Sequence, residues 1–318
     1  MKFEVLAIII AFFTCAQGIA QVSDRQSLEK PINPAHINSL MLSADYTTNT
    51  NIMGFFNPET KQPSFSPALS FFSKWGADAS ALVYFIGNSD DSLEHYTSEL
   101  DLMLGYNFKP AKHLTIYPSY SHFFHSSNSN SLKSIFSDDF RVDVDYNYKF
   151  LNIGVSAGYY LGRQNAFYTT VYNYYDIMVD RFLSRKGTLN IQPGVDANFG
   201  SYEYLNLYYL DELRKDPLFY FYLLSYPAIR RYVLAEMLKN PGSTKEEILD
   251  EYLMAQAQDN FKLTSVSLYL PLYYMIGDFG INLGLYFIIP LGQPDYMSDE
   301  TQFFFDAGVT YNFMIRGR

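Results

Sequence analysis

Apolar and polar residues alternate along much of this chain with a period of two. Residues 151–161, LNIGVSAGYYL, place Leu, Ile, Val, Ala and Tyr at every second position and Asn, Gly and Ser between them. Residues 279–287 and 303–313 follow the same alternation. Successive side chains of a strand point to opposite faces, so the pattern predicts strands with one apolar and one polar face.

Twelve segments carry this pattern and predict twelve antiparallel strands. They are residues 38–50, 63–74, 77–87, 95–108, 112–124, 139–149, 151–161, 166–178, 188–199, 260–274, 278–289 and 303–315. The connections after the second, fourth, sixth, eighth and tenth segments are short, and those after the fifth, ninth and eleventh are long. Short turns at one end and long loops at the other are typical of bacterial outer-membrane barrels, whose termini lie on the periplasmic side.

The composition of the two faces distinguishes a membrane barrel from a soluble sandwich. A sandwich turns its polar face to bulk water and usually carries Lys, Glu and Thr there, whereas these polar positions hold mainly Gly, Ser, Asn and Asp. The chain contains 29 Tyr and 27 Phe but one Trp, and its apolar faces end in aromatic residues. These features predict an all-β, antiparallel transmembrane β-barrel of about twelve strands over residues 38–315.

The N-terminus has the form of a secretory signal peptide. A single Lys precedes an apolar run at 5–13, and small residues follow it. The run is too short for a spanning helix, so residues 1–20 are predicted to be cleaved, leaving a periplasmic segment at 21–37. The alternative is a lipoprotein anchored at Cys15, the only cysteine. Loss of Cys15 with the signal peptide would exclude disulfides and cysteine-based metal sites from the mature chain.

Residues 200–259 interrupt the alternation and have a helical period. The run KNPGSTKEEILDEYL predicts a helix capped by Ser243, with Glu246 as its capping-box partner. An apolar stripe follows at Ile248, Leu249, Tyr252 and Leu253. Counting strands back from the C-terminus predicts an extracellular insertion. Its role is a lid over the barrel mouth, a docking site for a surface protein, a contact with the outer leaflet, or a protective cap alone.

Carried through all segments, the alternation assigns seven acids and one arginine to the lumen: Asp45, Glu99, Asp101, Arg141, Asp143, Asp145, Asp196 and Asp306. An acidic lumen favours cations and neutral polar solutes over anions. Alternatively, the acids pair with Lys74, Arg141 and Lys149 and fill the lumen.

The net charge of −10 and the lack of a Lys/Arg cluster along the sequence argue against nucleic acid as a partner. No metal-ligand spacing, phosphate loop or dinucleotide motif occurs, so we expect neither a metal nor a cofactor.

The mature chain resembles the outer-membrane barrels of Bacteroidota in composition and strand style. Its last strand ends on Tyr311, Phe313 and Ile315, similar to the C-terminal signal that the barrel-assembly machinery recognises. A basic tail, RGR, follows where many such proteins end on the aromatic residue. The resemblance implies the outer membrane of a Gram-negative bacterium, with outer-membrane lipids and the assembly machinery as partners.

Residues 125–128, HSSN, resemble the His-x-Ser-Asn signature of outer-membrane phospholipase A and the lipid A 3-O-deacylase. The resemblance implies His125 as base, Ser127 as nucleophile and Asp139 as the acid that orients the ring. This chain lacks the Gly that follows the Asn in those families. The strand phase also turns these side chains to the lumen, whereas those enzymes hold their triad on the lipid-facing wall. The alternative is a polar loop tip beside a lumen histidine.

Together these patterns predict a porin-like barrel: a narrow pore or binding barrel for a small neutral or cationic solute, covered by residues 200–259. One alternative is a non-conducting barrel that anchors a cell-surface protein complex through this insertion. A second alternative is a lipid esterase that uses His125, Ser127 and Asp139.

Overall fold

The structure, a computed structural model, describes residues 38–48, 63–87, 97–126, 135–163, 165–200, 219–257, 261–291 and 301–315. The predicted signal peptide and the segment 21–37 lie outside this part of the chain. The described strands are β1 (Asn38–Thr47), β2 (Ser64–Phe72), β3 (Ala77–Ile86), β4 (Thr97–Tyr106), β5 (Phe108–Ala111), β6 (Leu114–His125), β7 (Phe136–Tyr148), β8 (Leu151–Gly162), β9 (Ala166–Tyr175), β10 (Ile177–Asp180), β11 (Gly187–Ile191), β12 (Gly194–Gly200), β13 (Lys262–Ile276), β14 (Phe279–Pro290) and β15 (Gln302–Ile315). Three described helices lie between β12 and β13, namely α3 (Phe219–Ser225), α4 (Pro227–Lys239) and α5 (Lys245–Ala257).

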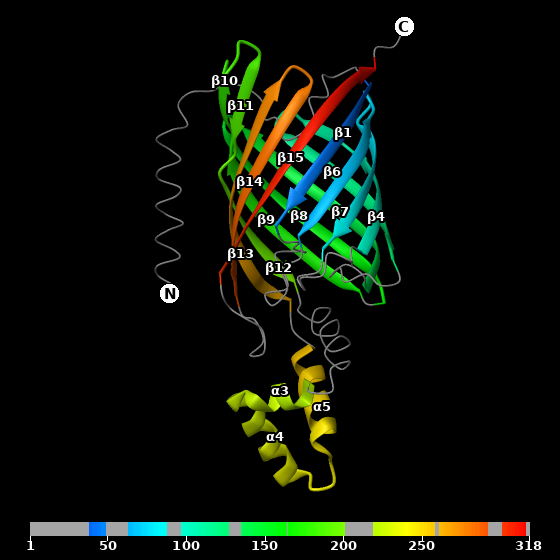
Figure 1. Cartoon of the computed structure of the whole chain (residues 1–318), viewed down its shortest axis with the longest axis vertical. Coiled ribbons are helices and arrows are strands. Elements are labelled where there is room, and N and C mark those ends of the chain that lie inside the picture. The colour runs from blue at the N-terminus through cyan, green and yellow to red at the C-terminus, as the bar shows by residue number, and fades with distance from the viewer. Residues whose placement is uncertain are drawn as a thin grey trace.

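The sheet closes on itself because its first and last strands pair. β1 and β15 are antiparallel, with Asn38 opposite Ile315 and Thr47 opposite Asp306. The wall runs β1-β2-β3-β4-β6-β7-β8-β9-β12-β13-β14-β15, while β5 extends the β4–β6 hairpin and β10 and β11 extend the β9–β12 hairpin. The prediction of a closed antiparallel barrel with twelve wall strands is confirmed (Figure 1).

The two ends of the barrel differ. The first residue of β1 and the last residue of β15 pair at one end, and the helices lie beyond the opposite end (Figure 1). In bacterial barrels both termini face the periplasm. We name the ends of the barrel by this rule, periplasmic where β1 begins and extracellular where the helices lie, and the extracellular place of the insertion stays a prediction.

The outer wall presents exposed apolar side chains in three zones. Aliphatic residues occupy the middle, among them Leu42, Leu69, Val142, Val155, Val171, Ile281 and Val309. Exposed aromatic rings border them at the extracellular end, including Phe65, Phe85, Phe124, Phe140, Phe287 and Phe303. Others border them at the periplasmic end, including Tyr106, Phe108, Tyr146, Tyr148, Tyr311 and Phe313. An apolar band between two aromatic girdles is the lipid-facing surface of a transmembrane barrel.

Glycines on the inner wall make room for tyrosine rings from the next strand. A Cβ atom at Gly154 would overlap the ring of Tyr172, its register partner across β8 and β9, and Gly158 stands in the same relation to Tyr168. Because the rings lie over the glycines, large side chains fit inside a narrow barrel.

The strand β7 begins three residues earlier than the sequence predicts and contains a bulge. Its register with β8 shifts between Phe136 and Asp138, so Ser137 is the extra residue. The bulge reverses the alternation, because Phe136 is buried inside while Asp138 lies on the outer side with Phe140.

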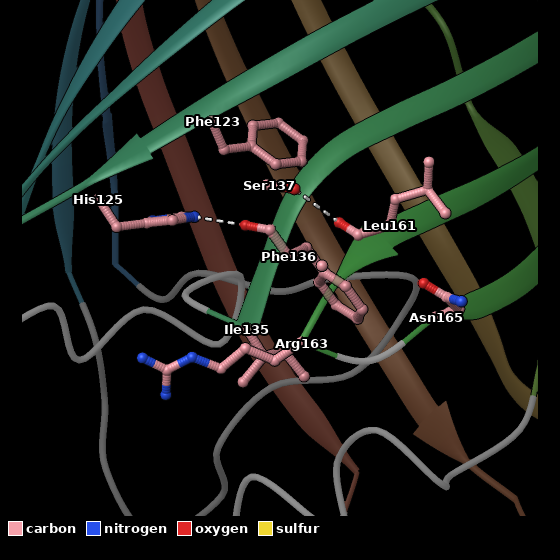
Figure 2. A pocket seen from close by; sticks show the side chains of 9 residues that line it. Phe123, His125, Ile135, Phe136, Ser137, Leu161, Arg163 and Asn165 are labelled. Carbon is pink, nitrogen blue, oxygen red and sulfur yellow. Dashed lines mark hydrogen bonds between the residues drawn. The ribbon is translucent and has the colours of Figure 1, made fainter.

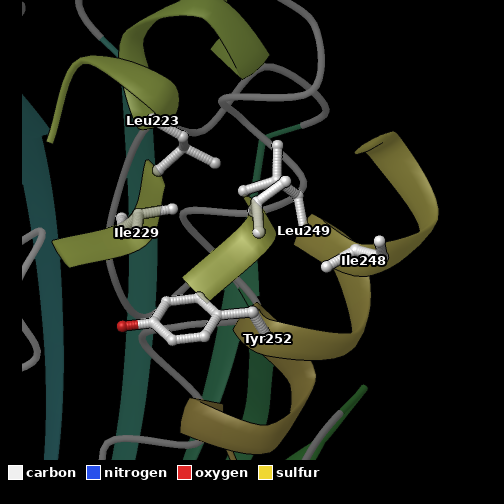
Figure 3. Packing of buried hydrophobic residues seen from close by; sticks show 6 residues of the cluster. Leu223, Ile229, Ile248, Leu249 and Tyr252 are labelled. Carbon is white, nitrogen blue, oxygen red and sulfur yellow. The ribbon is translucent and has the colours of Figure 1, made fainter. Parts of the chain in front are cut away.

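The three helices form a hydrophobic unit of their own. Its core consists of Leu223, Ile229, Val233, Ile248, Leu249 and Tyr252 (Figure 3). At the start of α5, the Glu247 amide donates to Thr244 Oγ1 at 3.2 Å, and the Thr244 amide donates to the Glu247 carboxylate at 2.9 Å. The predicted cap at Ser243 is therefore wrong by one residue, since the helix begins at Lys245 and its third residue is Glu247. No described helix is long and apolar enough to cross a membrane.

Candidate functional site

The structure places all eight predicted lumen residues on the inner wall, opposite the exposed apolar set. Asp45 lies on β1, Glu99 and Asp101 on β4, Arg141, Asp143 and Asp145 on β7, Asp196 on β12 and Asp306 on β15. Glu99 and Asp101 are only 2% and 6% exposed. Asp78 on β3 is a buried acid that the sequence analysis missed. Asp78 could have been assigned to the lumen from the sequence, because it lies two residues before Ser80 and shares the polar face of β3 with it.

Tyrosine hydroxyls hold several of these carboxylates in place. Tyr117 donates to Asp78 at 2.7 Å, Tyr172 donates to Asp145 at 2.5 Å, and the Tyr168 hydroxyl lies 3.1 and 3.2 Å from the two oxygens of Asp139. Each contact joins different strands, so the polar side chains link the wall from inside. Hydrogen bonds to a neutral hydroxyl leave the carboxylate its negative charge.

Only one of the three cations expected to neutralise the acids lies among them. Arg141 Nε is 3.4 Å from Asp143 Oδ2 on the inner wall. Lys74 and Lys149 are exposed in the periplasmic turns, with their amino groups 5.1 Å and 5.4 Å from the ring centroids of Trp75 and Tyr148. The expectation that these two lysines fill the lumen is wrong, because the strands end before them.

A cavity of about 450 Å³ opens at the extracellular end of β6, β7 and β8 (Figure 2). It is lined by Phe123, His125, Ile135, Phe136, Ser137, Leu161, Gly162, Arg163 and Asn165. Phe136, Tyr160 and Tyr168 form a stack that leads from the cavity along the inner wall, with ring centroids 4.6 and 4.9 Å apart. Arg163 is exposed at the rim. The mouth thus combines aromatic walls with polar groups, as small-molecule sites do.

Both ring nitrogens of His125 face acceptors. Nε2 lies 2.9 Å from the carbonyl oxygen of Phe136, and Nδ1 lies 3.3 Å from the carboxylate of Glu99. The Nε2 contact with a carbonyl oxygen requires an N–H at Nε2, which leaves Nδ1 as the nitrogen nearest to Glu99.

The structure does not bring His125 and Asp139 together. The register partner of Asp139 on β6 is Ser121, four residues before His125 and therefore roughly 13 Å away along the strand. Asp139 contacts Tyr168 instead, and Glu99 is the acid beside the histidine. Ser127 lies outside the described residues, so the hydrolase alternative stays a prediction. The acid expected for it, Asp139, does not lie beside His125.

A second histidine lies on the opposite, outward side of β6. His122 Nδ1 donates to Asp138 Oδ1 at 2.8 Å, and the Tyr120 hydroxyl donates to the same oxygen at 2.6 Å. Ser137 Oγ donates to the other oxygen of Asp138 at 2.6 Å. The bulge in β7 turns Asp138 outward and so allows this cluster to form, and no sequence pattern predicted the bulge. It satisfies the outward-facing carboxylate just beyond the aromatic ring of Phe140.

The closed antiparallel wall, its apolar band and its polar lumen define a transmembrane β-barrel of the outer-membrane type. Such barrels belong to the outer membrane of Gram-negative bacteria. No protein-family model matches the chain, and no curated protein matches it.

Solved structures of other barrels are similar to the chain. The KdgM porin is 10% identical, with a TM-score of 0.45, over 86% of this chain and 99% of that one. LpxR from Salmonella typhimurium is 10% identical, with a TM-score of 0.42, over 86% and 99%. An outer membrane channel from Pseudomonas putida F1 is 9% identical, with a TM-score of 0.43, over 91% and 100%.

Proposed function

We propose that the protein is a narrow outer-membrane channel or binding barrel for small neutral or cationic polar solutes. The observation that carries this proposal is the charge of the inner wall, where seven predicted lumen acids accompany one arginine. A row of fixed carboxylates in a narrow, low-dielectric passage raises the local concentration of cations and excludes anions.

Asp45 and Asp306 are the acids best suited to a test. They lie on neighbouring strands, β1 and β15, and act on each other electrostatically. Asn282 donates to Asp45 at 2.9 Å, and an asparagine at position 45 keeps an oxygen that can accept this hydrogen bond.

The decisive measurement is single-channel conductance of the refolded protein in planar bilayers under a salt gradient. We expect cation-selective openings, and a reversal potential closer to zero for Asp45→Asn with Asp306→Asn. Asp278→Asn is the matched control, because Asp278 is exposed in a periplasmic turn outside the lumen. Anion-selective openings would contradict the proposal. Silent bilayers from correctly folded protein would exclude the channel and leave only the binding barrel.

A second function is favoured by the helical unit. It has its own core and exposes large apolar side chains, with Phe221 74%, Leu234 54% and Leu238 84% exposed. Such a surface suits a barrel that anchors a partner protein at the cell surface. Gentle detergent purification tests it: a stoichiometric partner that disappears when Phe219–Ala257 is deleted supports this second function, and its absence from both preparations opposes it.

A further inference from the structure

The periplasmic turns repeat one pairing of residue types. An aromatic residue is the chain neighbour of a cation in four of them: Lys74 with Trp75, Phe108 with Lys109, Tyr148 with Lys149, and Arg181 with Phe182. All eight side chains are exposed. We call these eight residues the periplasmic rim.

Contacts within the rim keep cation and ring together. The amino groups of Lys74 and Lys149 lie over the rings of Trp75 and Tyr148, at the distances given above. Phe182 packs edge-on against Tyr274, with ring centroids 6.0 Å apart. The hairpin tip that carries it adds Arg185, Lys186 and an 81% exposed Leu183. In two of the four pairs the amino group thus lies over the neighbouring ring, and in a third the ring packs against a tyrosine of β13.

The rim lies where the lipid-facing wall ends. Aromatic rings at this level occupy the membrane interface, and lysine or arginine beside them reaches the headgroups. The chain as a whole carries a charge of −10, yet this border of the barrel is basic. Cations at the headgroup level attract anionic lipids, by about 1 kcal/mol or roughly fivefold in affinity for each residue.

We propose that the periplasmic rim is a binding site for anionic phospholipids of the leaflet that faces the periplasm. The phosphate and the headgroup charge contact Lys74, Lys109, Lys149 and Arg181, while the aromatic partners lie against the glycerol and upper acyl region. The site is separate from the lumen, so this proposal does not depend on whether the barrel conducts solutes.

Trp75 is the only tryptophan in the chain and lies within the site, so its fluorescence reports on the lipid bound there. The full-length protein is refolded into phosphatidylcholine vesicles that contain a minor fraction of brominated phosphatidylglycerol, or the same fraction of brominated phosphatidylcholine. We expect the anionic quencher to reduce Trp75 emission more strongly than its fraction predicts. High salt should remove this excess quenching, because exposed charges are screened.

A second protein has Lys74, Lys109, Lys149 and Arg181 all changed to Gln. Its preference for phosphatidylglycerol over phosphatidylcholine at Trp75 should be lower than that of the wild type by more than about tenfold. Its control changes Arg230, Arg231, Lys239 and Lys245 to Gln, four exposed cations of the helical unit. Quenching by brominated phosphatidylcholine should persist in both and shows that each barrel has inserted. Equal quenching by both lipids in the wild type would overturn the proposal. So would a response of Trp75 to soluble polyphosphate without preference for the anionic lipid.

Discussion

At the scale of single residues, the inner wall depends on pairs of a tyrosine and a glycine. The rings of Tyr168 and Tyr172 lie over Gly158 and Gly154, and their hydroxyls reach acids on the next strand but one. The glycine therefore decides where the tyrosine hydroxyl lies and so where a lumen carboxylate is held. Small and large residues are thus coupled across β7, β8 and β9.

Gly154→Ala is expected to destabilise the barrel by about 1–3 kcal/mol, since the new methyl group must displace the Tyr172 ring. Gly200→Ala, on β12, should have little effect, because a Cβ there meets only the Phe167 carbonyl oxygen, at 3.7 Å. Urea titration of the refolded protein, followed by the mobility shift of the folded barrel, measures both. Equal stability of the two variants would show that the ring moves freely.

At the scale of elements, a buried cluster of side-chain amides lies where β9 ends and β10 begins. The Asp176 carboxylate, between β9 and β10, accepts hydrogen bonds from Asn152 at 2.8 Å, Gln192 at 2.6 Å and Asn190 at 3.3 Å. Asn190 and Gln192 are fully buried. The backbone keeps its hydrogen bonds here, since the amides of Asp176 and Gln192 donate to the carbonyls of Phe150 and Pro271. The side-chain cluster adds a second link at the base of the hairpin that carries the basic tip of the periplasmic rim.

The cap of α5 gives an element-scale prediction that separates two neighbouring residues. Thr244→Ala should weaken the start of the helix by about 1 kcal/mol, because Thr244 Oγ1 accepts the Glu247 amide. Ser243→Ala should leave the helix unchanged. Hydrogen exchange of the first amides of α5 in the full chain measures the difference. Faster exchange in the Ser243 variant alone would place the cap where the sequence pattern predicted it.

At the scale of the whole molecule, barrel and helices are two hydrophobic systems. The barrel turns its apolar side chains outward to lipid, while the helices bury theirs in a core formed by α3, α4 and α5. The described helices therefore pack on one another, and the hydrogen-bond ladder of the barrel wall is formed without them.

Replacing Phe219–Ala257 with a short Gly/Ser linker should leave the barrel folded. The wall strands keep their hydrogen-bond partners in this variant, since the helices lie between β12 and β13 in sequence and outside the strand ladder. We expect an unchanged heat-dependent mobility shift on a gel and an unchanged β-sheet circular dichroism signal. Loss of the shift, with normal behaviour of the wild type refolded in parallel, would contradict a self-contained helical unit.

The sequence by itself determined the closed antiparallel barrel and the residue types of its two faces. Alternation with a period of two fixes the face on which each side chain lies, so Glu99, Asp143 and Asp306 turn inward once lipid takes the other face. The sequence did not determine which side chains meet. A one-residue bulge at Ser137 breaks the period, and contacts such as that of Glu99 with His125, register partners on β4 and β6, depend on the stagger between neighbouring strands. Only the closed tertiary structure sets that stagger, because it must satisfy every hydrogen bond around the wall at once.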